Sequence, residues 1–124
     1  MVRTMTLTDL SVRAQRVRTL YAQLETKRAG RAWTRAELAQ GFVGDVGDLM
    51  KLVMAKEGVR PSPTPDLDNA LAHELADCLW SVLVLADAYE IDLTKAFRTT
   101  MSELERKLES ECAGKPARSL RRRR

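Results

Sequence analysis

Four acidic residues of the 124-residue chain form two pairs with the same internal spacing. Asp45 and Asp48 lie three residues apart, and Glu74 and Asp77 repeat that spacing after a gap of 25 residues. In a helix this spacing puts both members of a pair on one face, so two antiparallel helices could bring all four carboxylates together. Oxygen ligands at such density favour a hard divalent cation, Mg²⁺ or Mn²⁺, over zinc.

The alternative is that each pair belongs to an ordinary solvated helix face. Residues 70–86 argue against it, because their polar side chains form one narrow stripe: His73, Glu74, Asp77 and Ser81. The rest of that circumference is apolar, so the helix must be buried, and buried charges need a partner such as a metal ion. So much apolar surface also predicts a homo-oligomer.

Helical segments are expected to position the four carboxylates. Apolar side chains at helical spacing predict a first helix over about residues 8–28. A capping box formed by Thr34 and Glu37 opens a second helix, which ends near Gly58.

Proline residues then interrupt the helical pattern, at positions 61, 63 and 65. Asp66 or Asp68 caps a third helix that continues to about Tyr89, and Asp92 or Thr94 caps a fourth. We find no strand-like alternation, so the predicted fold class is all-α, with one domain over residues 1–113.

Three glycines of the second helix, Gly41, Gly44 and Gly47, repeat at three-residue spacing. They indicate either the close approach of a neighbouring group or a weak helix. Trp80 is expected in the core or at a subunit interface rather than in a binding site.

The net charge of +4 is unevenly distributed along the chain. Residues 115–124 carry six cations and no acid, whereas the remainder has 15 Lys and Arg against 17 Asp and Glu. We expect residues 114–124 to be a disordered, Arg-rich tail. Nucleic acid is therefore not an expected partner, except weakly through this tail.

The composition also indicates the cellular compartment in which the protein is expected. Two cysteines cannot make a disulfide scaffold, and no signal-like apolar segment follows Met1. The longest nearly apolar stretch, residues 75–86, is too short to span a bilayer. We expect a cytoplasmic protein without a membrane partner.

The carboxylate motifs resemble those of the MazG-like all-α nucleotide pyrophosphohydrolases. The two pairs are similar to that family's E-x-x-E and E-x-x-D motifs. The segments V-G-D-V-G-D-L (43–49), H-E-L-A-D-C-L (73–79) and I-D-L-T-K-A (91–96) look like its V-G-E-V-G-E-L, E-L-A-D-V-L and G-I-D-L-x-x-A. The resemblance covers about residues 33–108 and is nearest to the dCTP-pyrophosphatase-type branch.

This resemblance implies a four-helix MazG-like bundle that assembles as a homodimer or homotetramer. It implies Mg²⁺-dependent hydrolysis of (deoxy)nucleoside triphosphates to monophosphate and pyrophosphate, a house-cleaning of the nucleotide pool, with Mn²⁺ as the alternative metal. The residues implied as both metal ligands and catalytic groups are Asp45, Asp48, Glu74 and Asp77.

Four further residues are candidates for substrate binding: Trp33, Lys51, His73 and Ser81. In the dCTP-pyrophosphatase-type branch a tryptophan like Trp33 helps form a base pocket, and Ser81 stands where that branch often has Tyr. His73 could contact metal-bound water or phosphate, and Lys51 could contact phosphate. The alternatives are packing for Trp33, a helix-surface hydrogen bond for His73 and simple solvation for Lys51.

Two departures from the family pattern support a second hypothesis. Asp45 and Asp48 stand where the family usually has Glu, which withdraws each carboxylate by one methylene. The family's K-M-x-x-N-x-x-R is replaced by a segment with Thr100 and Leu104 in place of its Lys and Asn. The alternative function is therefore a catalytically degenerate module that binds nucleotide or metal and has a regulatory role.

Overall fold

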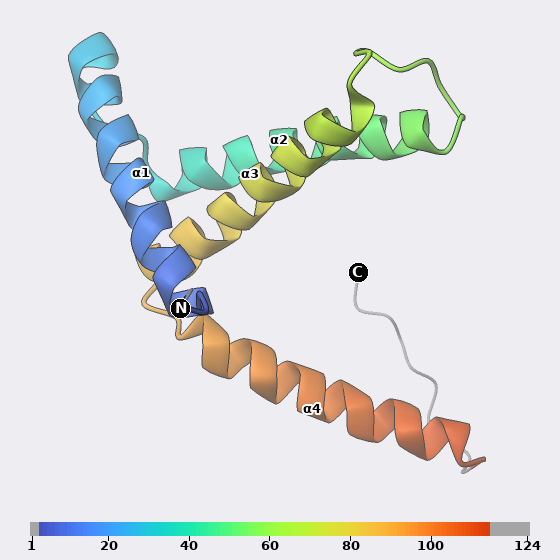
Figure 1. The fold of residues 1–124 in the computed structure, drawn as a ribbon. Coiled ribbons are helices and arrows are strands. Elements are labelled where there is room, and N and C mark those ends of the chain that lie inside the picture. Colours follow the sequence, from blue (N-terminus) through green and yellow to red (C-terminus); the bar gives the residue numbers. More distant parts are fainter. Residues whose placement is uncertain (1–2, 115–124) are drawn as a thin grey trace. The chain divides into compact units, whose positions relative to one another are not determined.

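Four α-helices and no strand make up residues 3–114, the part of the chain that the computed structural model describes (Figure 1). They are α1 (Leu7–Ala29), α2 (Arg35–Lys56), α3 (Leu67–Ala88) and α4 (Leu93–Cys112). The all-α fold class is confirmed, and the helix boundaries agree with those predicted to within about two residues at most ends. The predicted disordered tail lies outside the described residues from position 115 onward.

Polar side chains cap the N-terminus of every described helix. Thr34 accepts a hydrogen bond from the backbone N–H of Glu37, whose carboxylate accepts one in return, so the predicted capping box is present. Thr6 forms a second capping box at α1. Asp66 and Asp92 cap α3 and α4, which decides both alternatives left open by the sequence.

The link between α1 and α2 is short and held at both ends. Gly30 ends α1 with a φ of 79°, a left-handed conformation that glycine adopts without strain. Arg31 donates to Glu37 across 2.6 Å, and this hydrogen bond lowers the pKa of Glu37 to about 2. Residues 30–34 therefore run in one fixed path into α2.

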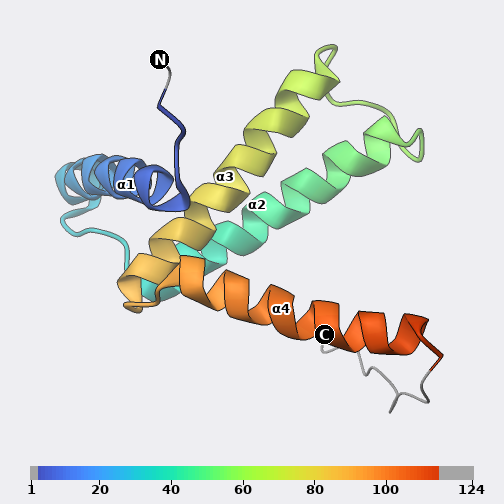
Figure 2. The same ribbon diagram turned by 60° about the horizontal axis from the view of Figure 1, so that its bottom comes forward.

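The structure divides into two compact units, Met1–Ile91 and Asp92–Arg124. In the first unit α2 and α3 lie side by side and antiparallel, joined at one end by the loop that carries the prolines (Figures 1 and 2). α1 packs against α3 at the opposite end of this pair. In the second unit α4 is strongly amphipathic, and its apolar side chains recur at helical spacing: Leu93, Phe97, Met101, Leu104 and Leu108.

The buried apolar side chains of the first unit come from all three of its helices: Ala14, Leu38, Leu52, Leu83 and Val84. The indole Nε1 of Trp80 donates a hydrogen bond to the Ala14 carbonyl across 3.1 Å. This contact ties α1 to the C-terminal half of α3.

The expectation that α3 is buried all round is wrong for the single chain. Leu75 and Leu79 are 54% and 43% exposed. The reason is geometric: α2 covers one face of α3, and α1 reaches only its C-terminal half. The remaining apolar face is open in the first unit.

α3 also has the length and hydropathy of a membrane-spanning helix, the one described helix that does, with a mean hydropathy of 1.2 over 18 residues. Core helices of globular domains have the same properties, so this is weak evidence for a membrane span. α3 carries Glu74 and Asp77 and packs against two other helices. These features favour a packed helix of the first unit over a membrane span, although only 22% of that window is buried.

Substituting Thr34→Ala tests the capping box. The change removes the acceptor for the Glu37 N–H, and we expect a loss of about 1 kcal/mol in the free energy of unfolding. Thr26→Ala is the matched control, because the Thr26 hydroxyl only donates to the Ala22 carbonyl inside α1. Urea denaturation followed by circular dichroism measures both; equal midpoints for the two variants would contradict the capping role.

Candidate active site

Three carboxylates meet across the seam between α2 and α3. Asp45 and Asp48 of α2 and Glu74 of α3 each place one oxygen within 4.8 Å of the other two. The spacing of three residues puts both aspartates on the same side of α2, and antiparallel pairing brings Glu74 to the same height. The predicted clustering is thus present for three of the four acidic residues.

The cluster has the donor set of a hard divalent cation. Mg²⁺ holds oxygen ligands at about 2.0–2.1 Å, so the ligands of one ion lie within roughly 4 Å of each other. Small rotations of the three side chains would bring them from 4.8 Å into this range. The Oε2 atom of Glu74 is buried and has no hydrogen-bond partner among the described residues. A buried carboxylate oxygen without a donor is costly, and a cation would satisfy it.

The charges of the cluster act against one another. Burial, followed by the charges of Asp77 and Asp48, raises the pKa of Asp45. Burial is also the main cause that raises the pKa of Glu74, with Asp77, Asp45 and Asp48 adding to it. The same surroundings raise the pKa of the half-buried Cys78 thiol, so this cysteine stays protonated. The site disfavours negative charge unless a cation is present.

Asp77 lies at the edge of the cluster. It is absent from the group of three oxygens, although its charge raises the pKa of both Asp45 and Glu74. Its Oδ2 lies 3.2 Å from Nε2 of His73, one turn earlier on α3. His73 therefore forms the helix-surface contact that the sequence left as one of two alternatives, and it does so beside the cluster.

A pocket of about 530 Å³ adjoins the carboxylates. Its volume is in the range of pockets that hold small organic ligands. Asp45 and Asp77 line the pocket on the side of the cluster. The other lining residues come from α1, α2, α3 and the link before α2: Val17, Tyr21, Glu25, Trp33, Leu38, Gly41, Ala76, Trp80 and Ser81.

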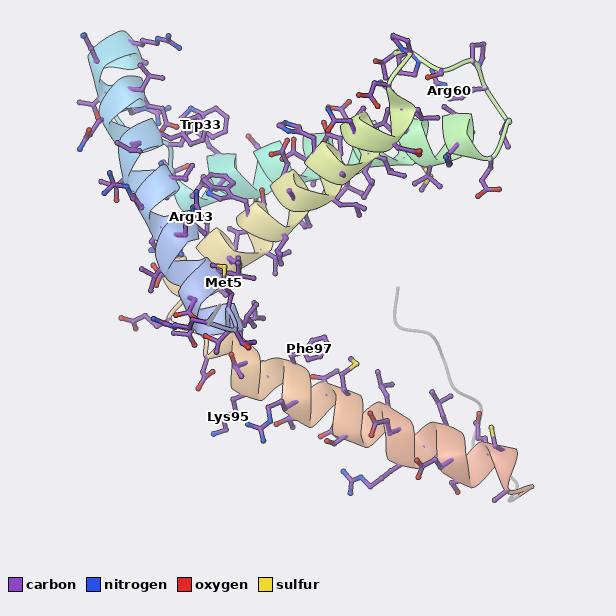
Figure 3. The ribbon with its side chains drawn as sticks, viewed as in Figure 1. Met5, Arg13, Trp33, Arg60, Lys95 and Phe97 are labelled. Carbon is purple, nitrogen blue, oxygen red and sulfur yellow. The ribbon has the colours of Figure 1, made fainter. Side chains whose placement is uncertain are left out.

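Aromatic rings form much of this pocket. Tyr21 and Trp80 meet edge to face with ring centroids 5.7 Å apart. Figure 3 shows Trp33 in the angle between α1 and α2. Trp80, which was expected in the core or at a subunit interface, donates through Nε1 to α1, and its indole also lines this pocket.

The four residues expected to bind substrate have different positions. Trp33 and Ser81 line the pocket, and Ser81 is buried at 4% exposure. His73 is one contact away from it, through Asp77. Lys51 is exposed on α2 and is not among the residues that line the pocket.

Sequence reasoning missed the contribution of α1. Neither Tyr21 nor Glu25 is among the residues that the sequence predicts to bind substrate, yet both line the pocket. An aromatic and an acid four residues apart share a helix face, but this spacing is common on solvated helices. Gly41 gave a clearer signal: a Cβ there would lie 3.2 Å from the Trp33 ring, so the glycine marks a close approach.

Comparison with protein-family models decides the family. Residues 34–110 match the model of the MazG nucleotide pyrophosphohydrolase domain. The chain belongs to this family. The match spans α2, α3 and most of α4, and it includes all four carboxylates of the two motifs. No curated protein and no solved structure gives a significant match.

The MazG match confirms the family resemblance but does not distinguish its branches. The dCTP-pyrophosphatase-type assignment stays a prediction. Trp33 lies one residue before the matched region, and α1 lies wholly before it. The wall of the pocket that α1 supplies is therefore outside the part of the chain that identifies the family.

Substituting Asp45→Asn tests the electrostatics of the cluster. Because the pKa values of Asp45 and Glu74 are raised in the folded chain, the stability they contribute falls as pH rises through their titration range. At neutral pH, removing one charge should therefore raise the melting temperature of the metal-free protein. The same change should reduce the stabilisation by added Mg²⁺.

Scanning calorimetry at pH 7, with EDTA and with 10-fold steps of Mg²⁺, measures both effects. Asp87→Asn, at the exposed C-terminal end of α3, is the control for removing an acid from this chain. A variant that melts lower than the parent without metal and keeps the full response to Mg²⁺ would contradict the metal site.

Proposed function

We propose that this MazG protein is a Mg²⁺-dependent nucleoside triphosphate pyrophosphohydrolase, releasing pyrophosphate and a nucleoside monophosphate. The observation that carries the proposal is the acidic cluster directly beside an aromatic-lined pocket. The cluster suits the metal and phosphate part of such a substrate, and the pocket suits its base. We propose a cytoplasmic location, where nucleotide pools are available.

Asp45, Asp48 and Glu74 would hold the metal ion, with Asp77 at the edge of the site. When bound, Mg²⁺ offsets phosphate charge and lowers the pKa of a water molecule. The chain itself supplies acceptor-only oxygens, and one of the four carboxylates would take the proton that the attacking water loses. Burial is the first cause that raises the pKa of Asp45 and of Glu74 in the metal-free chain.

The nucleobase would enter the pocket between Trp33 and the Tyr21–Trp80 pair. Flat aromatic surfaces stack on any base, which gives affinity without choosing the base. Asp45 and Asp77 line the side of this pocket next to the metal cluster. A nucleotide could therefore place its base among the rings and its phosphates at the carboxylates.

One observation favours the second candidate, a nucleotide-binding module without turnover. None of the described residues that line the pocket is a lysine or arginine, and Lys51 stands outside it. The described lining of this pocket therefore supplies no cation of its own to pair with phosphate charge. Binding of a nucleotide without release of pyrophosphate would select this candidate.

We propose that the chain assembles as a homodimer or homotetramer. The open apolar face of α3 includes Leu75 and Leu79, and α2 adds exposed valines at positions 43, 46 and 53. Several exposed apolar side chains on two packed helices are consistent with association between subunits. A second copy of the chain would cover it.

A nucleotide panel tests the activity. The protein, incubated with the common NTPs and dNTPs, should release pyrophosphate from at least one of them in Mg²⁺ and from none in EDTA. Asp77→Asn should lower this rate at least about 100-fold, since it removes a charge and a proton acceptor from the site. Asp87→Asn should keep the rate of the parent. Metal-independent release, or no release from any nucleotide, would contradict the proposed activity.

Light scattering during size-exclusion chromatography tests the assembly. The parent should elute at a dimer or tetramer mass, and Leu75→Lys should lower that mass by placing charges in the interface. Val12→Lys alters an exposed apolar residue of α1 and is the control. A monomeric parent protein would rule out the assembly.

A further inference from the structure

One ion pair on α1 holds the backbone of Trp33 on both sides. The Arg18 Nη1 atom lies 3.2 Å from Oε1 of Glu25, and the two side chains are only 18% and 16% exposed. Arg18 Nη2 also donates to the Trp33 carbonyl across 2.7 Å. Glu25 Oε1 accepts from the Trp33 N–H across 2.8 Å. The backbone N–H and carbonyl of Trp33 are thus both hydrogen-bonded to this ion pair.

The position of this pair is unusual for a surface salt bridge. Arg18 and Glu25 lie two turns apart on one face of α1, and both contact the link that leads into α2. Ion pairs on open surfaces contribute little, but hydrogen bonds to charged groups with limited solvent access are shorter and stronger. The pair therefore fixes the path of the backbone at Trp33.

The indole of Trp33 is fitted to the helix beside it. Its Cζ3 atom would lie 3.2 Å from a Cβ at position 41, closer than ordinary van der Waals contact, so the ring packs on the bare backbone of Gly41. Asp45 follows Gly41 by one turn on the same face of α2, and both line the pocket. The ring of Trp33 therefore packs on the same face of α2 that carries Asp45 of the acidic cluster.

We propose that Arg18 and Glu25 are positioning residues that hold the Trp33 indole in place to stack on the nucleobase. The inference rests on the proposed function, and it adds α1 to the site. Without the ion pair, the indole of Trp33 would be free to move away from the backbone of Gly41, because 45% of the surface of Trp33 is already exposed. Pre-ordering an aromatic surface lowers the cost of ligand binding without changing the chemical step.

The test uses the full chain with Glu25→Ala, Glu25→Gln and Arg18→Met. Arg16→Met is the matched control, because Arg16 is an exposed arginine of the same helix. For the nucleotide that the parent hydrolyses best, the KM of Glu25→Ala and Arg18→Met should rise about tenfold, in line with a weakened stacking contact, while kcat changes little. Glu25→Gln keeps an acceptor for the Trp33 N–H and should lie between them and the parent.

Inorganic tripolyphosphate separates the pocket from the metal site. As a competitive inhibitor it has no base, so its Ki should be the same in all variants. A general loss of structure would instead raise this Ki and lower kcat together. Equal KM values in Glu25→Ala, Arg18→Met and Arg16→Met would overturn the proposal.

The position of the indole is measured independently with 5-fluorotryptophan. Fluorine NMR of the labelled protein gives two signals, assigned with Trp33→Phe and Trp80→Phe. In Glu25→Ala and Arg18→Met the Trp33 signal should shift while the Trp80 signal stays in place. An unmoved Trp33 signal would overturn the proposal even if KM rises.

A parent protein that turns over no nucleotide would overturn the proposed function and the role in base binding together. The fluorine signals would then still report whether the ion pair orders the ring.

A pair of glycine variants completes the test. Gly41→Ala should raise KM by displacing the indole, whereas Gly44→Ala, with open space at its Cβ, should not. Equal KM values for these two variants would contradict the close fit between the ring and α2.

Discussion

The repulsion among three carboxylates at the α2–α3 seam is the constraint on which the rest of the site depends. Asp45, Asp48 and Glu74 bring their oxygens together where burial already penalises negative charge. A chain selected for stability alone would separate these groups or pair them with cations. The arrangement makes physical sense as a site that a divalent cation completes, in keeping with the MazG family to which the chain belongs.

The surrounding elements follow from that requirement. α2 and α3 must run antiparallel and in register to keep the carboxylates at one height, and the capped helix ends at Thr34 and Asp66 set where each helix begins. α1 then closes the open end of the pair through the Trp80–Ala14 hydrogen bond. The pocket forms in the angle between these three helices and shares Asp45 with the acidic cluster.

Much of this could be predicted from the sequence. Helix positions follow from caps and prolines, which are local signals, and the clustering of Asp45 with Glu74 follows from helical periodicity across one loop. The pocket could not be predicted in this way, because it depends on how α1 crosses the other helices. Arg18 and Glu25 look like solvated charges in the sequence, and only the turn at Gly30 brings the Trp33 backbone between them. The burial expected for α3 was wrong because one chain covers only part of its apolar surface.

Binding of a divalent cation by the acidic cluster can be measured with Mn²⁺, because the electron paramagnetic resonance signal of this ion in water decreases when the ion binds to protein. Titrating the protein with Mn²⁺ should show a saturable site that Mg²⁺ displaces and that Glu74→Gln weakens strongly. Weak, non-saturating binding that is the same in the parent and in Glu74→Gln would contradict cation binding by the cluster.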